Sequence, residues 1–221
     1  MTFKITSEVF MAGGENTHPH DAAVYLISSG GTCALVDAGT GKCTSRIIEN
    51  IKKAGADPAA VKYIFLTHCH YDHTGGAQEL REITGARIIA HELDAVYLSE
   101  RNSEVTAASW YGTAQPETTV DIIISGKNGK FTVGGIELTA IHAPGHTPGS
   151  IVLIIESDGK KILFGQDVHG PLHPALKSHR GDYINSLKML AALDADILCE
   201  GHYGVISGRE KVRDFIKSFI N

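Results

Sequence analysis

A strand-like apolar run at residues 61–67 leads directly into four ligand-type residues within six positions: His68, His70, Asp72 and His73. Alternate side chains of an extended chain share a face, so His68 and His70 can converge on one metal ion. If a helix begins after His70, Asp72 and His73 turn toward a neighbouring position, where a second ion fits. Isolated histidines near a turn are usually structural, but this density at a strand end favours metal binding. The segment therefore predicts a fold that assembles a metal site at the end of a strand.

One short segment cannot fill two coordination shells, so further ligands are expected at the ends of other strands. Three candidates follow apolar runs and are bordered by glycine: His146 in HAPGHTPGS, Asp167 after KILFGQ, and His202 after ILCEG. Glycine lets the backbone pack closely around a site. Each residue alone has an ordinary structural explanation, but their joint occurrence at successive strand ends indicates one shared site.

Strand and helix patterns alternate along the chain. The expected strands lie at 24–31, 32–39, 61–67, 86–91, 120–125, 130–133, 136–143, in a hairpin over 149–168, and at 197–201. The expected helices lie at 44–54, 77–84, 183–193 and 208–220. Two hairpins, each ending in an aspartate (Asp37 and Asp167), look like two versions of one unit. The pattern predicts an α/β sandwich of two β-rich layers with outer helices, forming one domain over residues 1–221. The segment 100–118 is either a flexible flap or a surface loop.

The composition is that of an ordinary globular protein: 221 residues, 43% hydrophobic and 20% charged, with a net charge of −5. Mild acidity without a Lys/Arg block argues against nucleic-acid binding and favours a small-molecule partner. No apolar run approaches the roughly 20 residues of a membrane-spanning helix, and the first ten residues do not resemble a signal peptide. Four widely spaced cysteines without a CxxC pair are typical of reduced thiols. We therefore expect a cytoplasmic protein without membrane association. Its oligomeric state stays open, a homodimer included.

The set THCHYDHTGG, APGHTPG, GQD and EGH resembles the metallo-β-lactamase superfamily, in the branch typified by glyoxalase II and the quorum-quenching lactonases. The resemblance spans nearly the whole chain and implies a four-layer αβ/βα sandwich with a dinuclear site at the layer edge. It implies that His68, His70 and His146 bind the first metal. It implies that Asp72, His73 and His202 bind the second and that Asp167 bridges the two. By analogy, Asp37 orients one of these ligands.

The ligand set contains only nitrogen and oxygen, because Cys69 is expected to point away from the histidines as a buried neutral thiol. This ligand chemistry suits zinc, the leading choice for the two divalent ions that the resemblance implies, and is also compatible with iron or manganese. Such a pair can supply a bridging hydroxide near neutral pH and polarise a carbonyl oxygen. This predicts hydrolysis of a small ester, thioester or lactone, with Asp72 relaying a proton to the leaving group.

Substrate contacts are less sharply indicated. The candidates are Trp110, His169, His173 and Tyr203. The loop after Asp167 also carries Lys177, His179 and Arg180, which would suit an anionic substrate, although a polar surface loop explains them equally well. Glyoxalase II enzymes carry a GCGR-like stretch after the bridging aspartate and a further domain after the last histidine. This sequence has neither, which argues against glutathione thioesters.

Two other functions stay open from the sequence. Persulfide dioxygenases resemble this pattern but use only the positions of His68, His146 and Asp167, around a single iron. The third reading is a metal-binding module without catalytic activity.

Overall fold

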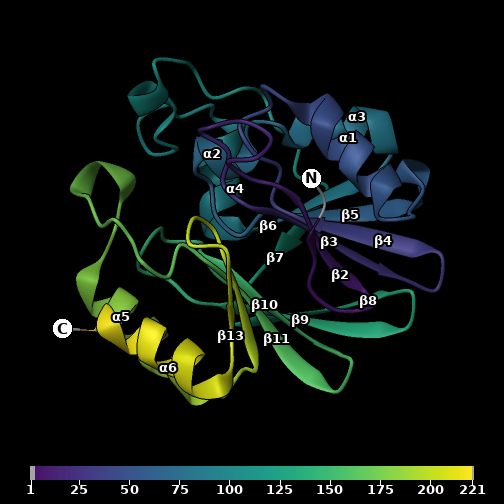
Figure 1. Ribbon diagram of the computed structural model, residues 1–221. Helices are drawn as coiled ribbons and strands as arrows, with labels where there is room; N and C mark the ends of the chain where they lie inside the picture. The colour runs from purple at the N-terminus through teal and green to yellow at the C-terminus, as the bar shows by residue number, and fades with distance from the viewer. Residues whose placement is uncertain (1–2, 221) are drawn as a thin grey trace.

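Two β-sheets packed face to face form the centre of the protein, as seen in the computed structural model, which describes residues 3–220 (Figure 1). The first sheet has the strand order β1-β2-β3-β4-β5-β6-β7, with parallel pairing from β4 to β7 and antiparallel pairing elsewhere. Its strands are β1 Phe3–Lys4, β2 Val9–Gly13, β3 Val24–Ser29, β4 Thr32–Val36, β5 Val61–Phe65, β6 Arg87–His91 and β7 Ile122–Ile124.

The second sheet has the order β13-β12-β11-β10-β9-β8, and only β11 and β12 pair in parallel. Its strands are β8 Asn128–Val133, β9 Ile136–His142, β10 Ile151–Ser157, β11 Lys160–Gln166, β12 Ile197–Glu200 and β13 Val205–Ser207. The two predicted hairpins are β3–β4 and β10–β11, and each contributes to a different sheet.

Helices cover the outer face of each sheet (Figure 1). They are α1 Thr44–Lys53, α2 Tyr71–Thr74, α3 Ala77–Thr84, α4 Glu92–Ser99, α5 Arg180–Ala192 and α6 Arg209–Ser218, with short 3-10 turns at η1 Pro58–Ala60, η2 Ala108–Tyr111 and η3 Pro174–Leu176. Helix α1 shows why: Ile47 and Ile51 lie one turn apart, are both buried, and pack on the first sheet. Helices α5 and α6 pack on the second sheet in the same way. The expected four-layer αβ/βα sandwich is confirmed.

The main core fills the space between the sheets. Aromatic rings from both sheets meet there, with Tyr25 against Phe164 at a centroid distance of 5.6 Å and Phe65 against Phe131 at 5.0 Å. Both contacts are edge-to-face, a favoured arrangement of aromatic rings. Neither sheet could bury its inner face alone, so the core fixes the two sheets relative to one another and thereby the loops at their edges.

The sequence-based expectation did not include β1, β2, α4 and β13. In α4 the apolar residues Leu93 and Val96 are 45% and 40% exposed, while Asp94 is buried, so apolar spacing does not mark the buried face. The helix expected at 183–193 begins earlier, at Arg180, because the His179 side chain caps it by accepting a hydrogen bond from the Asp182 amide.

The ends of the described chain leave two expectations untested. Residues 1, 2 and 221 lie outside the described residues, so the extent of one domain over 1–221 stays a prediction. Within residues 3–220, no helix is both long and apolar enough to span a membrane.

Candidate metal centre

The strand ends gather the predicted ligands at one edge of the sandwich. Because β4 and β5 run parallel, Asp37 and His68 emerge from the sheet side by side. After β5 the chain bends at residues 67–69, His70 is the N-cap of α2 with extended backbone angles, and the chain then turns into the helix that carries Asp72 and His73. This local change from strand to helix directs the two pairs of side chains to two neighbouring points.

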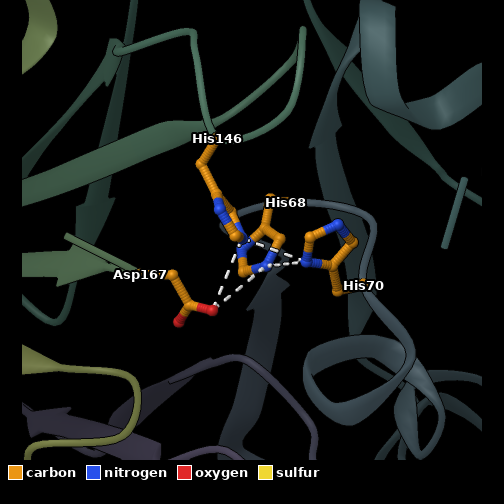
Figure 2. A group of neighbouring side chains, drawn as sticks. All are labelled: His68, His70, His146 and Asp167. Carbon is orange, nitrogen blue, oxygen red and sulfur yellow. Dashed lines mark hydrogen bonds and ion pairs between the residues drawn. The ribbon is translucent and has the colours of Figure 1, made fainter. Parts of the chain in front are cut away.

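The first cluster consists of His68, His70, His146 and Asp167 (Figure 2). The Nδ1 atom of His70 lies 3.1 Å from Nε2 of His68 and 3.0 Å from Nε2 of His146. Oδ2 of Asp167 lies 3.4 Å from Nε2 of His146 and 3.9 Å from Nε2 of His68. Four ligand atoms from three separate parts of the chain thus surround one point.

The second cluster consists of Asp72, His73 and His202. Oδ2 of Asp72 lies 3.2 Å from Nε2 of His202 and 3.8 Å from Nε2 of His73. Asp167 stands between the clusters, because Oδ1 lies 3.1 Å from Nε2 of His73 and Oδ2 lies 3.4 Å from Nε2 of His202. The structure therefore brings all seven predicted ligands together and places Asp167 where a bridging carboxylate would stand.

Hydrogen bonds on the far side of two of the rings direct the Nε2 atoms into the clusters. Nδ1 of His146 lies 3.0 Å from the carbonyl oxygen of Pro171, and Nδ1 of His73 lies 2.8 Å from the carboxylate of Asp37. Since both partners only accept, each Nδ1 carries a hydrogen, and Nε2 is the ring nitrogen that is left to bind a metal. Asp37 also accepts hydrogen bonds from the amide and hydroxyl of Thr67, which fix its carboxylate beside the ring of His73.

These residues fit divalent metal ions. The atom separations in the first cluster are close to about 3.4 Å, the edge of a tetrahedron with bonds of roughly 2.0–2.1 Å. In the second, Nε2 of His73 and Oδ1 of Asp167 are buried and make no hydrogen bond of acceptable geometry, although they are only 3.1 Å apart. Buried polar atoms without partners are rare in native proteins. A cation between them would satisfy both.

The two clusters differ in protonation. Burial lowers the pKa of His68 well below its ordinary value and that of His70 to about 3, so both rings are neutral. Burial alone would lower the pKa of His73, but the carboxylates of Asp167, Asp37 and Asp72 raise it well above its ordinary value. Burial likewise opposes protonation of His202, but hydrogen bonds to Asp167 and Asp72 raise its pKa to about 10. Metal binding at the second cluster must therefore release protons.

The backbone also approaches the clusters closely. A Cβ atom at Gly201 would collide with Oδ1 of Asp167 and lie 2.9 Å from Cε1 of His73. A side chain at this position would displace Asp167. Gly201, the glycine that precedes His202 in the sequence, is therefore required because no side chain fits at this position.

The sequence-based prediction did not include two buried acids near the site, Asp94 and Glu200. Asp94 accepts hydrogen bonds from the amides of Cys69 and Gly149, at 2.9 and 2.6 Å, and from the Thr147 hydroxyl at 2.6 Å. It thereby ties the 68–73 segment to the loop that carries His146. A single aspartate on a short helix gives no sequence signal for this role. Glu200 is the last residue of the apolar strand β12, and a charged residue at the end of a buried apolar run could have indicated a role at the site.

A pocket of about 160 Å³ opens over both clusters. It is lined by His70, Asp72, Ala107, Trp110, Tyr111, Asp167, His169, Pro171, Leu176 and His202. Of the predicted substrate contacts, Trp110 and His169 line this pocket. His173 is not part of the lining, but its ring lies 5.3 Å from that of Trp110. Tyr203 lines a separate cavity. Neither Lys177 nor Arg180 belongs to the lining.

Cys69, which lies between two of the histidines in the sequence, is fully buried. It packs in the apolar layer between the first sheet and its helices. Burial raises the pKa of its thiol well above the ordinary value. It is therefore a neutral interior thiol, as the alternation along the chain indicates.

Comparisons of this chain with family models, known sequences and solved structures point to the same family. The model of the metallo-beta-lactamase superfamily matches residues 18–202. The lactamase-like protein aptB of Emericella nidulans is 28% identical over 217 residues, which cover 96% of this chain and 62% of that protein. The probable metallo-hydrolase YqgX of Bacillus subtilis is 31% identical over 149 residues, which cover 66% of each chain. The chain thus spans a little under two thirds of the length of both relatives.

A solved structure shows the same fold. A HARLDQ-motif mutant of the metallo-beta-lactamase from Cronobacter sakazakii matches with a TM-score of 0.77 at 27% identity, covering 91% of this chain and 80% of that one. The family model, the fold and the ordered set of histidines and aspartates agree, and the chain belongs to the metallo-β-lactamase superfamily.

Proposed function

We propose that the protein is a hydrolase that uses two divalent metal ions, with zinc as the expected metal, to cleave a small ester, thioester or lactone. The observation that carries this proposal is the pair of adjacent clusters joined by Asp167. His68, His70 and His146 would hold one ion, Asp72, His73 and His202 the other, and Asp167 both. Ions held by these residues would supply an activated water molecule and would polarise a carbonyl oxygen.

The chain's own residues have distinct tasks in this proposal. Asp37 holds the ring of His73, and the Pro171 carbonyl holds the ring of His146, so both lone pairs point inward. Asp72 lines the pocket and is the carboxylate best placed to move a proton to the leaving group. Ala107, Trp110 and Leu176 line the same pocket and would help to exclude water from the reacting bond.

Several features favour this function over the two others. The oxygen-dependent alternative would use only three of the ligand positions, whereas Nδ1 of His70 faces the same point as the two other imidazoles of its cluster. The pocket above the clusters gives a substrate access, which a purely structural ion would not need. We also propose a small-molecule substrate rather than a nucleic acid. A reducing compartment such as the cytoplasm fits the four free cysteines.

Metal analysis combined with a substrate panel tests the proposal. Protein reconstituted with zinc, manganese or iron is expected to bind about two ions per chain and to hydrolyse at least one ester, thioester or lactone. His73→Ala should lose one ion and nearly all activity. His179→Ala, which removes an imidazole that is 69% exposed and outside both clusters, serves as the matched control.

Two results would contradict the proposal. One is active protein with a single ion per chain. The other is unchanged activity in His73→Ala. Oxygen consumption with a persulfide substrate on iron-loaded protein would point instead to the oxidative alternative, and bound metal without turnover of any substrate would point to a binding module.

A further inference from the structure

The strand β7 forms one edge of the first sheet, and its three residues are all isoleucines. Natural proteins usually protect a sheet edge with a proline, a bulge or a charged side chain, which prevents pairing with another chain. The opposite edge of the same sheet has Lys4 in β1, and the edge of the second sheet at β8 has Lys130. Although β7 is short, it contains no charged residue, no proline and no bulge. This edge is therefore open to a further strand.

The pairing of β7 with β6 shows which backbone groups lie on the free side of the edge. The amide of Asp121 donates to the carbonyl oxygen of Ile88 at 2.9 Å, so the backbone groups of Asp121 face β6. Backbone groups alternate in direction along a strand, so Ile123 also faces β6, while Ile122 and Ile124 face away from it. Within residues 3–220 no strand pairs with β7 on that side. Two N–H and two C=O groups are therefore available to a partner.

A groove of about 590 Å³ lies between β7, the segment 117–120 that precedes it, and α4. Its lining includes the apolar side chains of Ala95, Val96, Val120 and Ile123, together with Glu92 and Glu117. Val96 and Ile123 are 40% and 48% exposed, and Leu93, also on α4, is 45% exposed. Large apolar side chains gathered on one face are typical of an interaction surface.

We propose that the protein forms a homodimer in which β7 pairs with β7 of a second copy in antiparallel orientation about a two-fold axis at Ile123. In this register Ile122 of each copy exchanges two hydrogen bonds with Ile124 of the other, which makes four bonds in all. A register centred on Ile122 or on Ile124 would make only two. The two Ile123 residues then form a pair without mutual hydrogen bonds, in which side chains approach most closely. The edge is thus complementary to itself.

Charge also favours a second copy of this chain as the partner. Glu117 precedes β7, Lys127 follows it, and both side chains are exposed. Neither forms an ion pair within residues 3–220. Antiparallel pairing places the segment before β7 of one copy beside the segment after β7 of the other, which brings Glu117 toward Lys127 of the second copy. Three paired residues alone bury too little surface for a stable dimer, so the exposed apolar side chains of α4 belong to the proposed interface.

A disulfide across the axis tests the register. Residues in a non-hydrogen-bonded antiparallel pair have Cα atoms about 4.5 Å apart, which a disulfide can span. Ile123→Cys is therefore expected to form a covalent dimer on oxidation with diamide, in a Cys43→Ser background that lacks the half-buried native thiol. Ser125→Cys in the same background is the matched control. Ser125 is exposed, but in this register it lies about 13 Å along the strand from Ser125 of the second copy, so it should stay uncoupled.

Ile123→Lys tests the same surface without oxidation. The side chain is half exposed, so the substitution leaves the buried core in place, but it puts two ammonium groups beside the axis. Light scattering after size-exclusion chromatography should give twice the chain mass for the wild type at micromolar concentration. The dissociation constant of the dimer should rise at least about 30-fold in the variant. Phe3→Lys, at the opposite edge of the same sheet where the side chain is 58% exposed, should stay dimeric.

Three results would overturn the proposal. A wild type that is monomeric at about 100 μM would mean that the edge pairs with a different chain or with none. A dimer that persists in Ile123→Lys would place the interface elsewhere, and equal cross-linking of Ile123→Cys and Ser125→Cys would reject the register. If Ile123→Lys does not fold, as judged by circular dichroism, the two cysteine variants decide the matter. None of these measurements uses a substrate, so they test the dimer independently of the proposed hydrolase.

Discussion

Replacement of Asp37 by asparagine isolates the contact that orients His73. The Asp37 carboxylate is 3% exposed, lies 2.8 Å from Nδ1 of His73, and accepts the Thr67 amide at 2.8 Å. Its backbone has φ of 62°, a region that asparagine tolerates better than most residues, so Asp37→Asn keeps both shape and backbone. The variant loses the charge and directs the NH2 group of its amide at one or more of the three donors, which are the Thr67 amide, the Thr67 hydroxyl and Nδ1 of His73.

The expected cost follows from the charge state of His73 in metal-free protein. The three neighbouring carboxylates raise the pKa of His73 well above 6.5, so the ring is positively charged. Removing one charge-assisted hydrogen bond while Asp167 and Asp72 remain should lower the free energy of unfolding by about 1.5–3 kcal/mol. A raised histidine pKa stabilises the fold fully below the unfolded value and loses this effect as pH rises through the folded value. The difference should therefore be largest below about pH 6.5 and shrink in alkaline solution.

Urea unfolding in the presence of a chelator, at about pH 6 and about pH 10, measures this difference. Asp214→Asn, at an exposed position on α6, removes the same charge away from the site and is the control. With zinc present, Asp37→Asn should bind the second ion about 10- to 100-fold more weakly. A destabilisation below about 0.5 kcal/mol at the lower pH, or one that grows with pH, would refute the reasoning.

Two further results are expected. Asp94→Ala should lower the free energy of unfolding, measured in urea, by about 3–5 kcal/mol, because the hydroxyl of Thr147 and two buried amides lose a charged acceptor. A loss under about 1 kcal/mol would show that Asp94 contributes little to holding the two loops together. A thiol reagent should modify only the half-buried Cys43 in native protein and all four cysteines after denaturation, because the three others are buried. Burial also raises the pKa of the Cys69 thiol, so rapid reaction of Cys69 in native protein would contradict its buried position.

Much of the site is local in origin and could be predicted. The two-residue spacing of His68 and His70 predicted that they converge, which they do although the chain bends at residues 67–69, and the turn into α2 redirects Asp72 and His73. The helix expected at 77–84 also agrees with the observed bounds of α3. The roles of Trp110 and the other expected substrate contacts stay predictions, because side-chain chemistry alone does not say which loop residues face a pocket.

The sequence by itself determined the ligand types, their order along the chain and the strands that end in them, because these depend on residue identity and on the two-residue period of a strand. Only the tertiary structure decided that Asp94 joins two loops and that Glu200 aligns His169. The Asp94 contact with Thr147 spans 53 residues and that of Glu200 with His169 spans 31. The Asp94 contact joins loops of the two different sheets, whose distance is set by the core between them, and the Glu200 contact depends on the parallel pairing of β11 and β12 within the second sheet.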